Sequence, residues 1–257
     1  MKDQLGNAVH LPQAPRRIVS LVPSQTELLF DLGLDAEIVG ITKFCVYPAE
    51  KTKHKAKIGG TKNFNFGAIA ALKPDLIIGN KEENYEAGIK QLREICPVWL
   101  SDIVTFDDAL TMIQEVGLLV GKPQVAESLI QEIVTSFQNL PPVANPALSV
   151  AYFIWRKPYM VAAGGTFINE LLQIAGFQNV FSNLSRYPEV SAAQLQAANP
   201  DCIFLSSEPY PFKEKHLAEL REFCPAARVQ LVDGELFSWY GSRLRHSAAY
   251  FSTLRKD

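Results

Sequence analysis

The sequence lacks the features that mark membrane, nucleic-acid-binding and disulfide-rich proteins. No apolar run approaches the roughly 20 residues that a transmembrane helix needs, and the opening MKDQLGNAVHLPQAPRR has no apolar signal-peptide core. The formal net charge of −2 provides no basic field for nucleic acid or anionic lipid. The 4 cysteines form no C-x-x-C pair, which is typical of small buried thiols. These absences leave an ordinary globular protein.

Sequence signatures of catalysis are also missing. The chain has no nucleophile elbow, H-E-x-x-H helix, Walker loop or Rossmann glycine fingerprint. Ser24 follows an apolar run, but no histidine lies in a comparable loop to activate it, and we expect Ser24 to cap a helix with Glu27. The histidines are interpreted as surface residues rather than metal ligands: His10, His54, His216 and His246. We therefore predict neither an enzyme nor a metal site.

The chain contains an internal repeat. Leu72 to Pro97 reads LKPDLIIGNKEENYEAGIKQLREICP, and Ala198 to Pro225 reads ANPDCIFLSSEPYPFKEKHLAELREFCP. Both have Pro-Asp, an apolar run, a polar patch, a helical stretch and Cys-Pro. Upstream, TELLFDLGL resembles NELLQIAGF, and the strand-like runs RIVSLV and LSVAYFIW precede them. Alternating strands and helices predict a parallel sheet covered by helices, so the chain is interpreted as a duplicated α/β lobe.

The segment between the two copies is predicted to be helical. Asp107 and Asp108 suit a first helical turn, and the following apolar residues recur at helical spacing. Pro123 is well placed to open a second helix, which LPPVANP would end. The predicted domains are an N-terminal α/β lobe (1–105), a helical bridge (106–141) and a C-terminal α/β lobe (142–257).

Aromatic and arginine residues gather in loops that follow the predicted strands. Ligands of doubly wound sheets bind at the carboxyl ends of the strands. Rings there suit a broad, flat ligand, and arginines pair with its carboxylate or phosphate groups. The alternative is that about half of these rings pack beneath their loops. The predicted ligand-binding residues are Phe44, Tyr47, Phe64, Trp155, Arg156, Tyr159, Arg186, Tyr187, Trp239, Tyr240 and Arg243.

Several segments, in this order, resemble the class III substrate-binding proteins of ABC importers, which carry cobalamin, iron–siderophores or haem. They are RIVSLVPSQTELLFDLGL, KIGGTKNFNFGAIAALKPDLIIG and ANPDCIFLSSEP, and the resemblance spans about residues 5 to 254. It implies two Rossmann-like three-layer α/β lobes with parallel sheets, joined by a long backbone helix. It also implies a ligand in the cleft between the lobes, no intrinsic cofactor, and a monomeric receptor rather than an enzyme.

Within that family, the cobalamin-binding branch is the most similar. Its Tyr-Pro loop resembles Tyr47-Pro48, and its C-terminal aromatic and arginine segment resembles FSWYGSR. The resemblance implies a corrinoid ligand, with a ferric siderophore and then haem as alternatives. For haem, the candidate axial ligands are Tyr47 and Tyr240. Thr61 or Lys62 stands where the branch usually has a tryptophan, which is a departure from its pattern.

The resemblance further implies a membrane partner. Members of the family dock each lobe on the permease through a surface glutamate, which corresponds to Glu86 in the first lobe and to Glu214, with Glu208 as a rival, in the second. A periplasmic or membrane-surface location is expected if a leader has been removed. If Met1 is the native start, a leaderless cytoplasmic carrier or sensor is expected. An enzyme on a chelatase-like two-lobe fold is the remaining alternative.

Overall fold

The predicted strands assemble into two main sheets in the computed structural model, which describes residues 1–142 and 146–255. Inter-residue contacts divide the chain into two units. The first comprises Met1–Ile103, Asp107–Thr135 and Tyr240–Arg245, and the second comprises Val104–Phe106, Ser136–Trp239 and His246–Asp257. The chain thus returns to the first unit through the short segment 240–245. The domain boundaries expected from the sequence stay a prediction.

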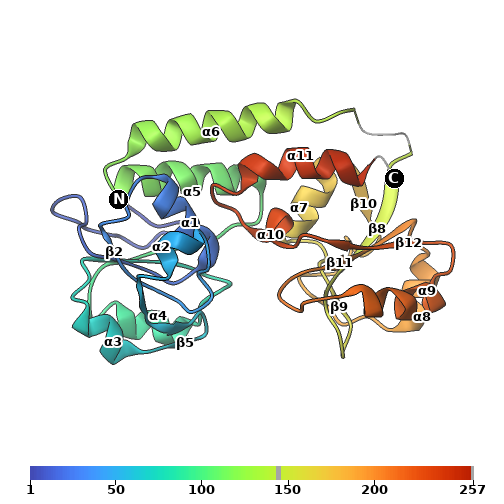
Figure 1. Ribbon diagram of the computed structural model, residues 1–257, viewed down its shortest axis with the longest axis horizontal. Helices are drawn as coiled ribbons and strands as arrows, with labels where there is room; N and C mark the ends of the chain where they lie inside the picture. Colours follow the sequence, from blue (N-terminus) through green and yellow to red (C-terminus); the bar gives the residue numbers. More distant parts are fainter. Residues whose placement is uncertain (143–145, 256–257) are drawn as a thin grey trace. The chain divides into compact units, whose positions relative to one another are not determined.

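The first unit contains a five-stranded parallel sheet in the order β3-β2-β1-β6-β7. Figure 1 labels β2 of this sheet and the helices α1 to α4 of the same unit. Its strands are β1 (Ile18–Ser20), β2 (Ile38–Ile41), β3 (Ala56–Lys57), β6 (Leu76–Asn80) and β7 (Val98–Ser101). The antiparallel pair β4 (Gly59–Gly60) and β5 (Asn63–Phe64) lies outside this sheet. The helices between the strands are α1 (Pro23–Asp31), α2 (Ala49–Thr52), α3 (Phe66–Ala71) and α4 (Glu86–Leu92).

The second unit contains a parallel sheet in the order β10-β8-β11-β12, with β9 antiparallel to β8. Its strands are β8 (Leu148–Trp155), β9 (Met160–Val161), β10 (Phe177–Asn179), β11 (Cys202–Ser206) and β12 (Arg228–Val232). Its helices are α7 (Phe167–Ile174), α8 (Ala192–Ala198), the 3-10 turn η1 (Glu214–His216), α9 (Leu217–Phe223) and α10 (Glu235–Ser238), and α11 (Leu244–Leu254) follows.

The two sheets repeat one topology. The order β2-β1-β6-β7 in the first unit matches β10-β8-β11-β12 in the second, and each strand has the same place along its half of the chain. Lys73 and Asn199, which precede the two Pro-Asp pairs, both adopt positive φ, at 47° and 43°. The repeat in the sequence therefore encodes the same strand order and the same turn twice, in an α/β fold with two parallel-sheet lobes.

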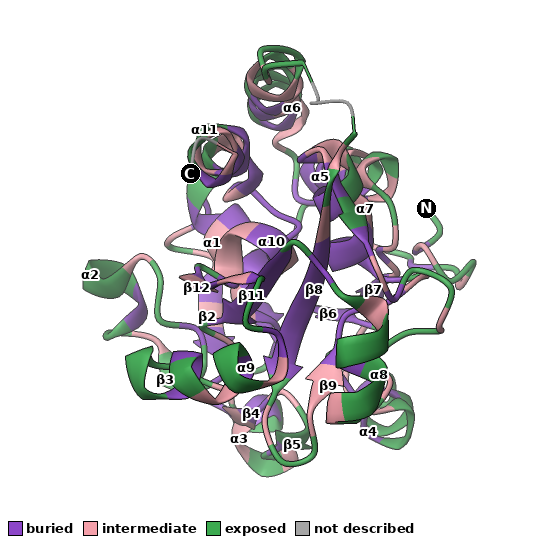
Figure 2. Ribbon diagram, turned by 90° about the vertical axis from the view of Figure 1, so that its right-hand side faces the viewer, coloured by how far each residue is buried: buried purple, intermediate pink, exposed green. Residues whose placement is uncertain are grey.

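Burial explains why the apolar runs of the sequence form strands. Both sheets are covered by helices, so most residues of their central strands are buried, which favours nearly continuous apolar sequences (Figure 2). In β11 every residue is buried, and in β8 only the ends are more accessible. The outward faces of α2 and α9 are exposed. Each sheet is therefore the centre of its own core.

Two helices connect the repeated parts. α5 (Phe106–Leu119) has Asp107 and Asp108 in its first turn, and α6 (Pro123–Gln138) begins at the predicted proline. Gly117 allows close packing of α5 on α6, because a Cβ there would lie 2.3 Å from Cβ of Ala126. The first unit includes α6 up to Thr135, and the last turn of α6, from Ser136, belongs to the second unit. The segment predicted to end α6, LPPVANP, lies partly outside the described residues.

Two local predictions were wrong. Ser24 does not cap α1: the helix begins at Pro23 after Val22, no side chain caps it, and Ser24 is buried within the first turn. Proline at the first position starts the helix at Pro23, two residues earlier than a capping box formed by Ser24 and Glu27 requires. His216 is 5% exposed rather than a surface residue, because Tyr210 and Phe212 pack against its ring. In the described part of the chain, no helix is long and apolar enough to cross a membrane.

Candidate functional site

Buried polar side chains line the carboxyl edge of the first sheet. Ser20, Asn80 and Ser101 are the last residues of β1, β6 and β7. Gln25 of α1 donates from Nε2 to Oγ of Ser101 at 2.7 Å, and Asn80 donates from Nδ2 to the same oxygen at 2.9 Å. Thr26 donates to Oγ of Ser20 at 2.7 Å. Oε1 of Gln25 is buried without a hydrogen-bond partner among the described residues. The other bonds tie the ends of β1, β6 and β7 to one another or to α1, and so support the loops that follow these strands.

The loop after β6 is shaped by two asparagines. Asn80 accepts hydrogen bonds at Oδ1 from the backbone amides of Glu82 and Glu83, at 2.8 and 2.9 Å. Asn84 accepts at Oδ1 from the Asn80 amide at 2.9 Å and donates from Nδ2 to the Thr61 carbonyl oxygen at 3.0 Å. Asparagine side chains commonly stabilise turns in this way. The polar segment NKEENYE therefore has a defined conformation.

The predicted aromatic residues of the first unit differ in accessibility. Phe44 and Tyr47, on the loop between β2 and α2, are 51% and 39% exposed. Phe64 is buried and stacks on Tyr85 with ring centroids 5.0 Å apart. Tyr240 is also buried, and burial raises the pKa of its hydroxyl well above the usual value. Phe44 and Tyr47 can offer ring surface to a ligand, whereas burial favours a packing role for Phe64 and Tyr240. Ligand contact for all four stays a prediction.

Arg243 is held by a carboxylate that sequence reasoning missed. It donates from Nε and from a terminal nitrogen to the two carboxylate oxygens of Glu27, at 2.9 and 2.7 Å. The guanidinium carbon also lies 4.4 Å from the centre of the Tyr47 ring. The two partners of the ion pair are 216 residues apart in the chain, and no local pattern signals such a pairing.

A second carboxylate organises the predicted residues of the other unit. Glu219 of α9 accepts from Nε and a terminal nitrogen of Arg156, at 2.9 and 2.8 Å, and from the hydroxyl of Tyr159. Burial raises the pKa of Glu219, but these hydrogen bonds outweigh it and leave the pKa lowered. Burial and the bond to Glu219 raise the pKa of Tyr159. Trp155, at the end of β8, is 40% exposed and meets Tyr210 edge to face at 5.7 Å.

The remaining predicted residues of this unit lie in two places. Arg186 is exposed, donates to the Gly165 carbonyl oxygen at 2.7 Å, and lies 5.6 Å from the centre of the half-buried Tyr187 ring. Trp239 is 7% exposed and donates from Nε1 to Glu208 at 2.9 Å. Arg186 and Tyr187 are therefore accessible, whereas Trp239 is packed.

The glutamates predicted for permease docking are accessible. The side chain of Glu86, the first residue of α4, is 83% exposed and forms an ion pair with Lys90 at 2.6 Å, which lowers the pKa of Glu86. Glu214, the first residue of η1, is exposed. Its rival Glu208 accepts hydrogen bonds from Ser238 and Trp239 within the unit. Accessibility therefore favours Glu214 over Glu208.

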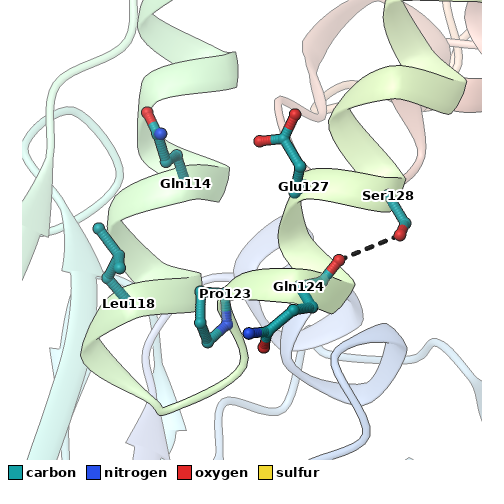
Figure 3. Close-up of a pocket in the computed structure, with 6 residues that line it drawn as sticks. All are labelled: Gln114, Leu118, Pro123, Gln124, Glu127 and Ser128. Carbon is teal, nitrogen blue, oxygen red and sulfur yellow. Dashed lines mark hydrogen bonds between the residues drawn. The ribbon is translucent and has the colours of Figure 1, made fainter.

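A pocket of about 450 Å³ lies between the end of α5 and the start of α6 (Figure 3). None of the predicted ligand-binding residues lines it; its walls are Gln114, Leu118, Pro123, Gln124, Glu127 and Ser128. Over residues 1–142 and 146–255, no group of three or more His, Cys, Asp or Glu side chains is arranged to hold a metal ion. Neither feature indicates a catalytic centre.

Repeated parallel-sheet units that carry exposed rings beside their strand ends define a class of ligand-binding proteins made of two α/β lobes. Comparison with known proteins identifies the family within this class. The profile of the family described as periplasmic binding protein matches residues 18–228. The chain belongs to the periplasmic binding protein family, whose members are non-catalytic substrate-binding proteins of ABC transporters. The resemblance stated from the sequence is confirmed.

Individual relatives agree with this assignment. A vitamin B12-binding protein from Vibrio campbellii (strain ATCC BAA-1116) is 28% identical over 195 residues, which cover 74% of this chain and 70% of the relative. An uncharacterised ABC transporter substrate-binding lipoprotein from Bacillus subtilis (strain 168), YvrC, is 27% identical over 78% of this chain and 67% of the relative. A solved structure, titled as a possible iron-binding periplasmic solute-binding protein of Staphylococcus epidermidis ATCC 12228, has a TM-score of 0.80. It is 22% identical and covers 95% of this chain and 100% of that chain.

Proposed function

We propose that this protein is the receptor of an ABC importer for a corrinoid, a flat, amide-rich macrocycle. The observation that carries the proposal is the pair of half-exposed rings beside the strand ends, Tyr47 after β2 and Trp155 at the end of β8. Each unit supplies one such ring, and each also has an arginine held by a carboxylate nearby. The 28% identity to a vitamin B12-binding protein supports this choice of ligand.

The chemistry of these side chains suits a corrinoid. Aromatic rings provide large, rigid apolar contact area for a macrocycle, and ligand sites combine such surfaces with a few placed polar groups. Arg156 and Arg243 each use two donors on a glutamate. Two strongly held arginines are less available for an anionic ligand than they appear in the sequence, which favours a ligand that is recognised mainly by shape.

An anionic metal complex, such as a ferric siderophore or haem, is the second candidate. The observation that favours it is the segment 43–62, which carries six lysines and a single glutamate and includes the exposed Phe44 and Tyr47. Binding driven by this segment would weaken steeply with added salt, because exposed charges are screened. Binding of a corrinoid through ring contacts would change little with salt.

The test is a calorimetric and absorbance titration of the purified protein with cyanocobalamin, cobinamide, haemin and a panel of ferric siderophores, each at low and high salt. Saturable, salt-insensitive binding of cyanocobalamin or cobinamide, with the ligand recovered unchanged, supports the corrinoid receptor. Tight binding of haemin or a siderophore alone would overturn the corrinoid assignment in favour of the second candidate. Chemical conversion of a bound compound would contradict the receptor function.

We also propose that Glu86 and Glu214 dock the loaded protein on its permease, at a periplasmic or membrane-surface location. Both residues are exposed and stand at the starts of helical segments in the two units. Alanine substitutions should leave ligand affinity unchanged and reduce uptake by the reconstituted importer. Glu94→Ala and Glu222→Ala, which remove other exposed carboxylates, are matched controls. Equal uptake by all four variants would contradict this assignment.

A further inference from the structure

We propose that Arg243 is a positioning residue: together with Glu27 it holds the Tyr47 ring in place, rather than pairing with an anionic group of the ligand. The sequence alone favours ligand contact, because an arginine near aromatic loops commonly binds carboxylate or phosphate. The contacts in the first unit favour the positioning role. This inference rests on the proposed function insofar as it concerns ligand affinity.

The ion pair with Glu27 occupies the guanidinium of Arg243. Nε and a terminal nitrogen of Arg243 donate to separate carboxylate oxygens of Glu27, at 2.9 and 2.7 Å. The side chains are only 15% and 18% exposed, respectively. A two-pronged pair of this kind fixes the plane of the guanidinium as well as its place. An anionic group of the ligand would have to compete with Glu27 for donors that are already used in a largely buried pair.

The same guanidinium contacts the Tyr47 ring. The guanidinium carbon of Arg243 lies 4.4 Å from the ring centre, within the range of a cation–π interaction. Tyr47 belongs to a loop whose neighbouring Phe44 and Val46 are 51% and 48% exposed. A ring on such a loop loses conformational freedom when it binds a ligand, and a contact that orders it beforehand reduces that cost.

The backbone on both sides of Arg243 is packed against the rest of the first unit. Its neighbours Ser242 and Leu244 are 1% and 0% exposed. Gly241 packs so closely on α1 that a Cβ there would lie 2.7 Å from the carbonyl oxygen of Ser24. Arg245 forms an ion pair with Asp31 of α1 at 2.9 Å. The backbone around Arg243 is therefore fixed on the helix that carries Glu27, so the guanidinium is a rigid support for the ring.

A double-mutant cycle separates the two roles, with cyanocobalamin as the probe. The variants are Tyr47→Ala, Arg243→Gln and the combination of both. If Arg243 acts through Tyr47, Arg243→Gln weakens binding about tenfold in the wild-type background but less than about twofold in the Tyr47→Ala background. Glu27→Gln should reproduce the loss caused by Arg243→Gln. An equal loss in both backgrounds, or an unchanged affinity in Glu27→Gln, would overturn the proposal.

The position of the Tyr47 ring can also be measured without ligand, which tests the role of Arg243 whatever the ligand is. With 3-fluorotyrosine incorporated, the ¹⁹F resonance of Tyr47, assigned by its absence in Tyr47→Phe, should shift or broaden in Arg243→Gln and in Glu27→Gln. Thermal unfolding of each variant checks that the unit remains folded. A Tyr47 resonance that is unchanged in folded Arg243→Gln would overturn the positioning role. If cyanocobalamin does not bind while the resonance moves, the ligand assignment fails and the positioning role stands.

Discussion

Asp201 and Ser149 bind each other in both directions. The amide and the hydroxyl of Ser149 donate to Oδ2 of Asp201 at 2.8 and 2.7 Å, and the Asp201 amide donates to the Ser149 hydroxyl at 2.9 Å. In the first unit, Asp75 accepts from the backbone amides of Arg16 and Arg17 at 2.8 and 2.9 Å. The aspartate of each Pro-Asp pair thus ties its strand to the beginning of the neighbouring one. The repeated Pro-Asp pair therefore has a structural role: it joins neighbouring strands.

Removing this carboxylate should destabilise the protein. We expect Asp201→Ala to lower the free energy of unfolding by about 1 kcal/mol, the usual size for the loss of such a side chain to backbone bond. Asp201→Asn keeps an acceptor oxygen and should lose less. Chemical denaturation at pH 7 measures both, and Glu222→Ala, which removes an exposed carboxylate of the same unit, is the control. Equal stability of Asp201→Ala and the wild type would contradict the role of Asp201.

The stabilisation that the hydrogen bonds between Ser149 and Asp201 provide depends on pH. Hydrogen bonds from Ser149 hold the pKa of Asp201 below its ordinary value of 3.8. Because the folded-state pKa is the lower one, the stabilisation is fully present above the ordinary value and is lost as the pH falls through the folded-state pKa. The difference in stability between the wild type and Asp201→Asn should therefore shrink in acid.

Local patterns predicted most of the regular structure. The run LSVAYFIW coincides with β8, and α6 begins at Pro123 as expected. These features depend on burial and backbone preference over a few residues, which a single sequence records directly. The duplication added a second copy of each pattern, and two agreeing copies identified short strands such as β1 that have only three residues.

Contacts across long stretches of the chain could not be predicted in the same way. The pairing of Arg243 with Glu27 and that of Arg156 with Glu219 depend on how the chain returns to each unit. In the sequence, these arginines look like free cations for a ligand. The burial of Phe64 under Tyr85 is likewise set by packing. Sequence reasoning thus located the loops of the candidate site but not the partners of its charged residues.

The cysteines should be unreactive in the folded protein. All four are free; burial raises the pKa of Cys45, Cys202 and Cys224, and burial together with the charge of Asp75 raises that of Cys96 to about 12. At pH 8, a pKa of about 12 leaves only about one thiolate in ten thousand, and the thiolate is the reactive form. Mass spectrometry after treatment with iodoacetamide should show no rapid labelling before urea is added and four additions afterwards.

A matched control shows that the reagent works under native conditions. Ser128→Cys places a thiol on the exposed side of α6 and should be alkylated rapidly in the folded protein. Rapid labelling of a native cysteine in the wild type would contradict the protection expected from the burial of Cys45, Cys202 and Cys224 and from the raised pKa of the half-buried Cys96.

Trp155 should account for the tryptophan emission that iodide can quench. It is 40% exposed, whereas Trp99 and Trp239 are 0% and 7% exposed, and a hydrated anion does not enter the apolar interior. Trp155→Phe should remove the accessible fraction, and Trp239→Phe should retain it. Saturating cyanocobalamin should protect Trp155 from iodide if the ring contacts the ligand. Bound cyanocobalamin that leaves the accessible fraction unchanged would exclude Trp155 from the site.

His216 should make the stability of the protein depend on pH near neutrality. Its Nδ1 accepts a hydrogen bond from the Lys213 amide at 2.9 Å, which only the neutral ring can do on that nitrogen. Burial lowers the pKa of His216, the charges of Arg156, Lys215 and Lys213 lower it further, and Glu219 opposes them. The folded-state pKa is therefore below the ordinary value of 6.5. Stability is fully present above 6.5 and is lost as the pH falls toward the folded-state pKa, by at most about 1.4 kcal/mol per pH unit.

Urea unfolding from pH 7 to pH 5 tests the contribution of His216. The wild type should lose more stability over this range than His216→Gln, whose side chain does not titrate. His246→Gln, which removes an exposed histidine, should follow the wild-type curve. Because protonation of His216 would break the bond that holds the start of η1, the variant should be the less stable protein at pH 7 and should approach the wild type at pH 5. Parallel curves for the wild type and His216→Gln would show that the buried ring does not titrate in this range.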